Sequence, residues 1–116
     1  MGWLRIRLRG DEGDTLRLRF AERMKDSDSL FMLNLRTALV TDTYVSAHKA
    51  ATWEPRFTLH GFRFVELSGF KRQPSLADIQ GRVVYDRMAT TGTFDTSDPT
   101  INAVYHCAVW GIRGNY

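Results

Sequence analysis

The sequence contains a single cysteine, Cys107, among its 116 residues. A lone thiol excludes any disulfide within the chain. A nucleophilic role would require an activated thiolate and a base nearby. The adjacent His106 cannot supply that base from a helix, because neighbouring helix residues point in different directions. We therefore expect Cys107 to be a buried structural residue, as free cysteines commonly are.

Long apolar runs are also missing. No stretch approaches the ~20 apolar residues that cross a bilayer, so no membrane partner is expected. Arg5, Arg7 and Arg9 interrupt the first residues, which therefore do not form a signal peptide. The absence of an export signal slightly favours a cytoplasmic location. With 43% hydrophobic and 25% charged residues, the composition is typical of a globular domain.

Motifs for metals and phosphates are absent as well. The three histidines, His48, His60 and His106, show no ligand spacing with Cys107 or with one another. The glycines of residues 10–13 lack the lysine and the strand-to-helix context of a phosphate loop. We therefore expect no metal and no cofactor.

Arginine is the residue type that is unevenly distributed. The formal net charge is only +3, but five arginines fall within the first twenty residues: Arg5, Arg7, Arg9, Arg17 and Arg19. Without an RNA- or DNA-binding motif, we expect a solvated or interdomain arginine face and no nucleic-acid partner. Like charges side by side repel, so acidic partners are expected nearby.

The first twenty residues predict two strands. Apolar and arginine side chains alternate over residues 4–9 and again over 16–20, with a Gly/Asp-rich turn at 10–14 between them. Period-two alternation is typical of half-buried strands. Two such runs around a turn predict an antiparallel hairpin with one buried face and one arginine face.

The rest of the chain predicts more strands and one helix. Strands are expected over residues 41–45, 53–59, 62–67 and 81–88. Asp98 is a suitable helix cap and Pro99 a suitable first residue; apolar residues then recur at helical spacing, and Gly114 is a stop signal. The fold class is therefore mainly β, an antiparallel β-sandwich with one C-terminal α-helix.

Glu54 and Glu66 are the two carboxylates placed inside predicted strands. Arg56 and Arg63 lie close to them in sequence. We interpret these glutamates and arginines as partly buried ion pairs that fix the packing of the strands or a domain interface. A glycosidase pair is not expected, because the remaining acidic residues lie mostly in turns.

Several stretches together resemble bacterial α-L-rhamnosidases of glycoside hydrolase family 78. They are Asn34-Leu35-Arg36-Thr37-Ala38 with Thr41-Asp42-Thr43-Tyr44, Trp53-Glu54-Pro55-Arg56-Phe57-Thr58-Leu59-His60-Gly61-Phe62-Arg63-Phe64-Val65-Glu66, Gly92-Thr93-Phe94-Asp95, and residues 102–115. The hairpin run 16–22 also looks familial. The likeness covers nearly the whole chain, with departures at Leu59 and Ile112.

The resemblance implies a layout and an activity. Residues 1–80 would form a concanavalin-like, jelly-roll type β-sandwich. Residues 81–116 would form a linker strand and the first helix of a truncated (α/α)6-barrel catalytic domain. The family performs inverting hydrolysis of terminal α-L-rhamnosides with an acid and a base, and its catalytic acids lie further along the chain. No catalytic residue can therefore be carried over.

We interpret the chain as a rhamnosidase fragment that is inactive alone and supports the missing catalytic barrel. A strand at the first residues and an apolar-striped helix at the last are the reasons to expect truncation. The structural or interface candidates are Glu54, Arg56, His60, Arg63, Trp110 and Arg113. The alternative is a non-catalytic carbohydrate-binding module, in which Trp3, Tyr44 and Trp53 stack on an L-rhamnosyl sugar.

Overall fold

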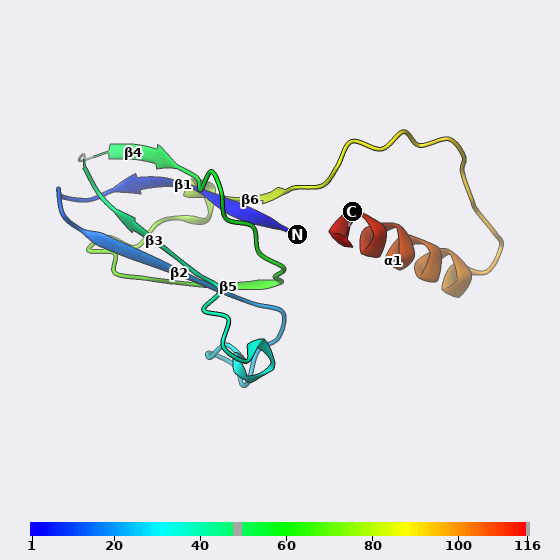
Figure 1. Cartoon of the computed structure of the whole chain (residues 1–116), viewed down its shortest axis with the longest axis horizontal. Coiled ribbons are helices and arrows are strands. Elements are labelled where there is room, and N and C mark those ends of the chain that lie inside the picture. The colour runs from blue at the N-terminus through cyan, green and yellow to red at the C-terminus, as the bar shows by residue number, and fades with distance from the viewer. Residues whose placement is uncertain (48–49, 116) are drawn as a thin grey trace.

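Two three-stranded sheets pack face to face and form a β-sandwich (Figure 1). The computed structural model describes residues 1–47 and 50–115. One sheet has the order β4 (Ala50–Trp53), β1 (Gly2–Arg9), β6 (Ile79–Val83), and the other β3 (Thr41–Val45), β2 (Thr15–Ala21), β5 (Phe64–Ser68). All neighbours are antiparallel. Short 3-10 turns η1 (Leu33–Leu35) and η2 (Leu76–Asp78) and the helix α1 (Pro99–Asn115) complete the fold. The predicted class is confirmed.

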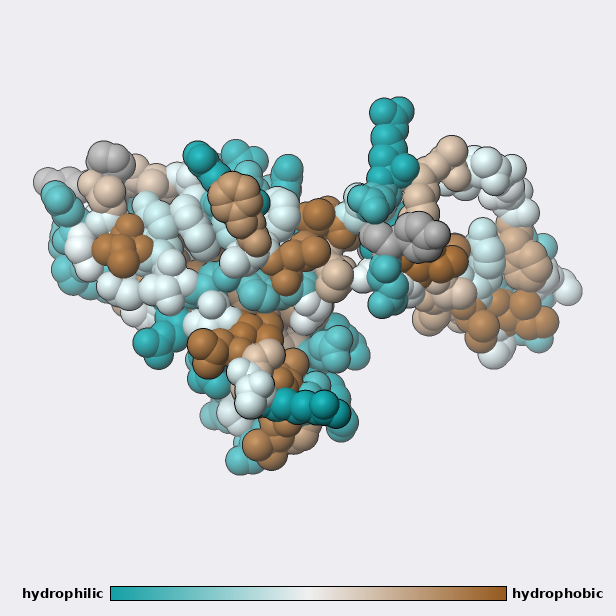
Figure 2. Space-filling model, viewed as in Figure 1, coloured by the Kyte–Doolittle hydropathy of each residue, from teal (hydrophilic) through white to brown (hydrophobic). Residues whose placement is uncertain are grey.

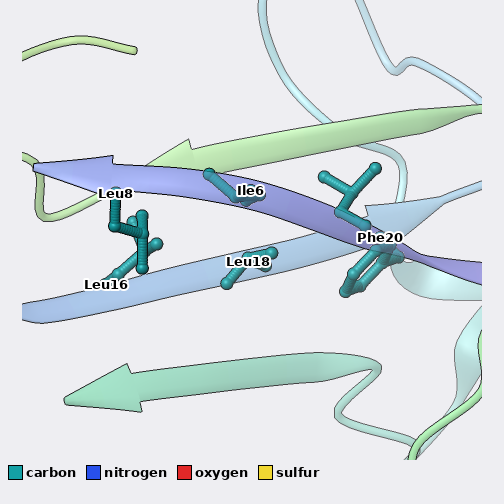
Figure 3. Packing of buried hydrophobic residues seen from close by; sticks show 6 residues of the cluster. Ile6, Leu8, Leu16, Leu18 and Phe20 are labelled. Atoms are coloured by element: carbon teal, nitrogen blue, oxygen red, sulfur yellow. The ribbon is translucent and has the colours of Figure 1, made fainter. Parts of the chain in front are cut away.

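The core lies between the central strands of the two sheets. Its buried members are Leu4, Ile6 and Leu8 from β1 and Leu16, Leu18 and Phe20 from β2. In Figure 3, Leu8 and Leu16 point toward each other, and Ile6 and Leu18 lie further along the same two strands. Ile6, Leu18 and Phe20 are fully buried. Apolar residues occupy every second position of β1 and β2, and they form this layer because every second side chain of a strand faces inward.

The predicted hairpin between the first two strands is wrong. β1 and β2 do not pair; each is the central strand of a different sheet. A hairpin would have placed both apolar faces on one side of one sheet, where another layer would have to cover them. In the sandwich the two faces cover each other. The single predicted arginine face is wrong for the same reason: Arg5, Arg7 and Arg9 lie on one outer face, and Arg17 and Arg19 on the opposite one.

The turn at residues 10–14 crosses between the sheets. Gly13 adopts a positive φ of 83°, which glycine tolerates without strain. Its N–H donates to Ser46 O at 2.8 Å, at the end of β3. Lys71 Nζ lies 2.8 Å from Asp14 Oδ1 and 3.1 Å from Asp11 Oδ2. The hydrogen bond from Lys71 lowers the pKa of the Asp14 carboxyl below its ordinary value.

Other strand boundaries differ from the predictions. The strand expected at 53–59 ends at Trp53, since Pro55 has no N–H to donate to a ladder. The strand expected at 81–88 runs from Ile79 to Val83, where its pairing with β1 stops. It therefore spans the predicted division at residue 80. The strands at 41–45 and 62–67 are present as β3 and, shifted slightly, as β5.

The helix α1 lies apart from the sandwich (Figure 1). Asp98 Oδ1 accepts a hydrogen bond from Thr100 N at 2.8 Å, so the predicted cap and the start at Pro99 are confirmed. Gly114 does not stop the helix, which continues to Asn115. No residue of α1 is buried. The expectation of a buried Cys107 is therefore wrong, because nothing in the described chain covers that face; Cys107 is exposed.

Truncating the core should unfold the sandwich. We expect Phe20→Ala to lower the free energy of unfolding by about 3–5 kcal/mol, because it removes a fully buried ring and leaves a cavity. The matched control is Phe57→Ala, whose ring is 98% exposed and should cost less than about 0.5 kcal/mol. Urea denaturation followed by circular dichroism measures both. Equal losses would contradict this account of the core.

Candidate functional site

An open groove runs beside the end of β4 and the segment that follows it. Its cavity volume is about 1020 Å³. Its lining combines aromatic, hydroxyl and charged side chains: Trp3, Thr41, Asp42, Thr43, Thr52, Trp53, Glu54, Pro55, Arg56, Phe57 and Thr58. This groove brings together Trp3, Trp53, Glu54 and Arg56 from the residues that the sequence indicated. Tyr44 is outside it and instead packs against Trp53, with ring centroids 5.2 Å apart.

Glu54 lies on the outer face of the β4-β1-β6 sheet. Its Oε2 accepts a hydrogen bond from Trp3 Nε1 at 3.0 Å and lies 3.9 Å from Arg82 Nε. Glu54 therefore contacts Trp3 and Arg82 and not Arg56, the partner expected from the sequence. Glu66 likewise pairs with Arg19 at 3.1 Å, and not with Arg63. Arg63 instead lies over the ring of Phe64, with its guanidinium carbon 5.7 Å from the centroid.

The two glutamates are on opposite sides of the molecule. Glu66 stands across from Arg19 in the register of β5 and β2, on the outer face of that sheet. Glu54 shares the opposite outer face with Trp3 and Arg82. Glycosidase carboxylates must flank one bond, about 5–9.5 Å apart. Glu54 and Glu66, with the core between them, cannot act as such a pair.

His60 forms a buried polar contact with Asp42, one of the residues that line the groove. His60 Nε2 lies 3.0 Å from Asp42 Oδ1, and the two side chains are 11% and 6% exposed. A carboxylate only accepts, so this contact is a hydrogen bond in the tautomer that carries a proton on Nε2. The His60 ring also stacks on Phe20, with centroids 4.3 Å apart. Backbone hydrogen bonds join His60 to Gly2 in both directions, at 2.8 and 2.9 Å. His60 therefore links β1 to the core of the opposite sheet.

Asp42 was not singled out from the sequence, although a signal exists. It stands across from Leu18 in the register of β3 and β2, a position that faces the core. A carboxylate at an inward position of a strand needs a buried partner, and His60 supplies it. Asp42 Oδ2 has no hydrogen-bond partner among the described residues.

The helix contributes the two remaining candidates. The Arg113 guanidinium lies over the rings of Tyr85 and Trp110, 5.1 and 5.3 Å from their centroids. Asn102 ties the helix to the segment before it, accepting from Thr96 N at 2.9 Å and donating to Asp95 Oδ1 at 3.0 Å. These contacts hold α1 against residues 85–96 and leave several apolar side chains of the helix exposed: Ile101, Val104, Trp110 and Ile112.

The described residues contain neither a cluster suited to a metal ion nor a membrane-spanning helix. Over 1–47 and 50–115, no group of three or more His, Cys, Asp or Glu side chains is placed to hold a metal ion. In the same residues, no helix is long and apolar enough to cross a membrane. His48, one of the histidines considered above, lies outside the described residues.

In comparisons with known proteins, the chain matches α-L-rhamnosidases each time. Residues 1–85 match the model of the bacterial α-L-rhamnosidase concanavalin-like domain. An α-L-rhamnosidase of Streptomyces avermitilis is 42% identical over 117 residues, which cover 100% of this chain and 11% of that protein. One from Formosa agariphila is 41% identical over 107 residues, covering 90% of this chain and 12% of that protein.

Solved structures share the architecture. The crystal structure of Streptomyces avermitilis α-L-rhamnosidase complexed with L-rhamnose superposes with a TM-score of 0.90 at 42% identity, over 99% of this chain and 11% of that one. The present chain thus spans about a tenth of the length of the relatives it matches.

Removing the His60 imidazole should destabilise the sandwich. His60→Phe keeps a ring against Phe20 but leaves the Asp42 carboxylate buried without a donor, which should cost about 3 kcal/mol or more. His60→Phe combined with Asp42→Leu should recover much of that loss, because the uncompensated charge is gone. Urea denaturation of the two single variants and the double variant tests the coupling. A double variant no more stable than His60→Phe would contradict it.

Proposed function

The chain belongs to the family of bacterial α-L-rhamnosidase concanavalin-like domains, and on that basis we propose that it is an accessory domain that supports the catalytic domain of an α-L-rhamnosidase. In this proposal the longer protein hydrolyses terminal α-L-rhamnosides, and this chain has no hydrolytic activity of its own. The observation that carries it is the match of the chain to about a tenth of each much longer relative.

The engagement of the carboxylates supports inactivity. Glu54 is held by Trp3 and Arg82, Glu66 by Arg19, and Asp42 by His60. Glu54 and Glu66 lie on opposite outer faces, so they share no cleft in which a glycosidic bond could lie between them. We propose that these residues maintain the shape of the sandwich, together with the interface candidates Arg56 and Arg63.

Exposed apolar surface supports a packing role. Met1, Leu59 and Val83 are 51%, 43% and 54% exposed, and they surround Gly2, which pairs with both His60 and Val83. Figure 2 shows hydrophobic surface at this end of the sandwich and along α1. Contiguous apolar surface of this kind marks interaction sites. We propose that the catalytic (α/α)6 barrel covers it, with Trp110 and Arg113 at the contact.

The division into two units is part of the same proposal. We propose a β-sandwich unit up to about residue 80, and a linker strand and a first barrel helix from 81 to 116. The ladder between β6 and β1 ties the start of the second unit to the first. Such a ladder would fix where the helical domain begins relative to the sandwich.

A rhamnosidase assay tests the catalytic part of the proposal. We expect the chain to release no detectable nitrophenol from an aryl α-L-rhamnoside, because no carboxylate pair is available. The Streptomyces avermitilis relative serves as the positive control. The proposal would be overturned if the chain hydrolysed the substrate and Glu54→Gln or Glu66→Gln abolished that activity. The control Glu12→Gln, in the exposed turn, would have to leave the activity unchanged.

The groove favours a second candidate, a carbohydrate-binding module. Trp3 and Trp53 line it together with Glu54 and Arg56, and a relative's structure contains L-rhamnose. Both indoles are only partly exposed, however: Trp53 packs on the core, and the Trp3 N–H is already bonded to Glu54. Neither ring is presented as an open stacking platform.

Titration with L-rhamnose distinguishes the two candidates. The accessory role predicts no saturable change in tryptophan fluorescence at millimolar sugar, with D-glucose as the matched control. A saturable change specific for L-rhamnose, lost in Glu54→Gln and kept in Trp110→Phe on the helix, would favour the binding module.

A further inference from the structure

A row of arginines follows β1 along the outer face of its sheet. Arg5, Arg7 and Arg9 are all exposed, and alternate residues on one side of a strand are spaced about 6.6–6.8 Å apart. Arg72 joins Arg7 and Arg9 in one hollow. We call Arg5, Arg7, Arg9 and Arg72 the arginine track.

The track carries more positive charge than its surroundings neutralise. Arg7 lies 3.8 Å from Asp78 Oδ1. Within the described residues, Arg5, Arg9 and Arg72 have no carboxylate within 4.0 Å. Hydrogen bonds from Ser75, aided by Arg7 and Arg9, lower the pKa of the Asp78 carboxyl, so Asp78 stays ionised and still neutralises only one arginine.

The track is hollowed and continuous. One hollow of about 180 Å³ is lined by Arg5, Arg7, Thr52, Ala77, Asp78 and Gln80. A second, of about 380 Å³, shares Arg7, Ala77 and Asp78 with it and extends to Arg9 and Arg72. From Arg5 to Arg9 the strand covers about 13 Å, and Arg72 extends the surface further. An extended ligand could contact several guanidinium groups at once.

The chemistry of the lining indicates the class of ligand. None of the residues that line the two hollows is an exposed large apolar side chain, whereas the centre of a protein interface needs apolar anchors. Phe70, the aromatic residue that lines the second hollow, is partly buried against the core, so its ring offers little surface for the base stacking that single-stranded nucleic acids use. The carboxylate of Asp78, the amide of Gln80 and the hydroxyl of Thr52 instead suit a ligand with hydroxyl groups.

We propose that the arginine track binds an acidic polysaccharide, whose uronate carboxylates pair with the guanidinium groups while its hydroxyls bond to Asp78, Gln80 and Thr52. Arginine holds a carboxylate through two parallel hydrogen bonds, and several such pairs along one chain reinforce each other. This binding does not depend on the rhamnosidase proposal, since it requires no catalysis and, of the residues it uses, only Thr52 also lines the groove.

Polygalacturonate is the probe, and fully methyl-esterified pectin, in which the carboxylates are blocked, is the matched ligand. Isothermal titration at fixed low salt should show binding to the first and none to the second. Arg5→Gln with Arg9→Gln should weaken the affinity by about tenfold or more, since two charge-assisted contacts are lost. The control with the same net charge is Arg17→Gln with Arg87→Gln, both away from the track, which should change it less than about twofold. Thermal melts confirm that both double variants are folded.

Several results would overturn the proposal. They are no binding to polygalacturonate, equal binding to the esterified polymer, or equal losses in the two double variants. Polyglutamate binding as tightly as polygalacturonate would assign the track to an acidic protein surface. Duplex DNA binding as tightly, with a steep salt dependence, would assign it to nucleic acid.

Discussion

The packing of β1 against β2 across the sandwich is the interaction on which the rest of the structure depends. Leu4, Ile6 and Leu8 meet Leu16, Leu18 and Phe20 with little or no exposed surface. Each strand is central in its sheet, so the other four strands are positioned by pairing with one of the two. The buried apolar layer thus determines both the sheets and which side chains face outward.

The outer faces follow from that layer. Because side chains alternate along a strand, burying the even-numbered residues of β1 forces Arg5, Arg7 and Arg9 outward, and Trp3 with them. Glu54 and Arg82 then meet Trp3 on the same face. On the opposite sheet the same alternation places Arg17 outward and Arg19 next to Glu66. Surface charge is therefore arranged by the core, and it separates the two glutamates that a catalytic role would have to bring together.

The buried pair of His60 and Asp42 adds specificity to this frame. In the register of β3 with β2, the carboxylate of Asp42 faces the core, and His60 is its partner there. Its imidazole also stacks on Phe20, while the backbone of His60 pairs with Gly2. One residue in the loop between β4 and β5 thereby fixes the first residues of β1 against the opposite sheet. This arrangement is consistent with a domain whose role is to hold a shape.

The sequence by itself determined which residues of the first two strands are buried, the mainly β class, and the start of the helix. Each of these depends on local periodicity or on a cap such as Asp98, which neighbouring residues specify. Only the tertiary structure decided that β1 and β2 lie in different sheets, that Glu54 meets Trp3 and Arg82, and that Cys107 is exposed. Alternation says which way a side chain points but not which strand lies beside it, because strand partners are chosen by contacts between residues far apart in the chain.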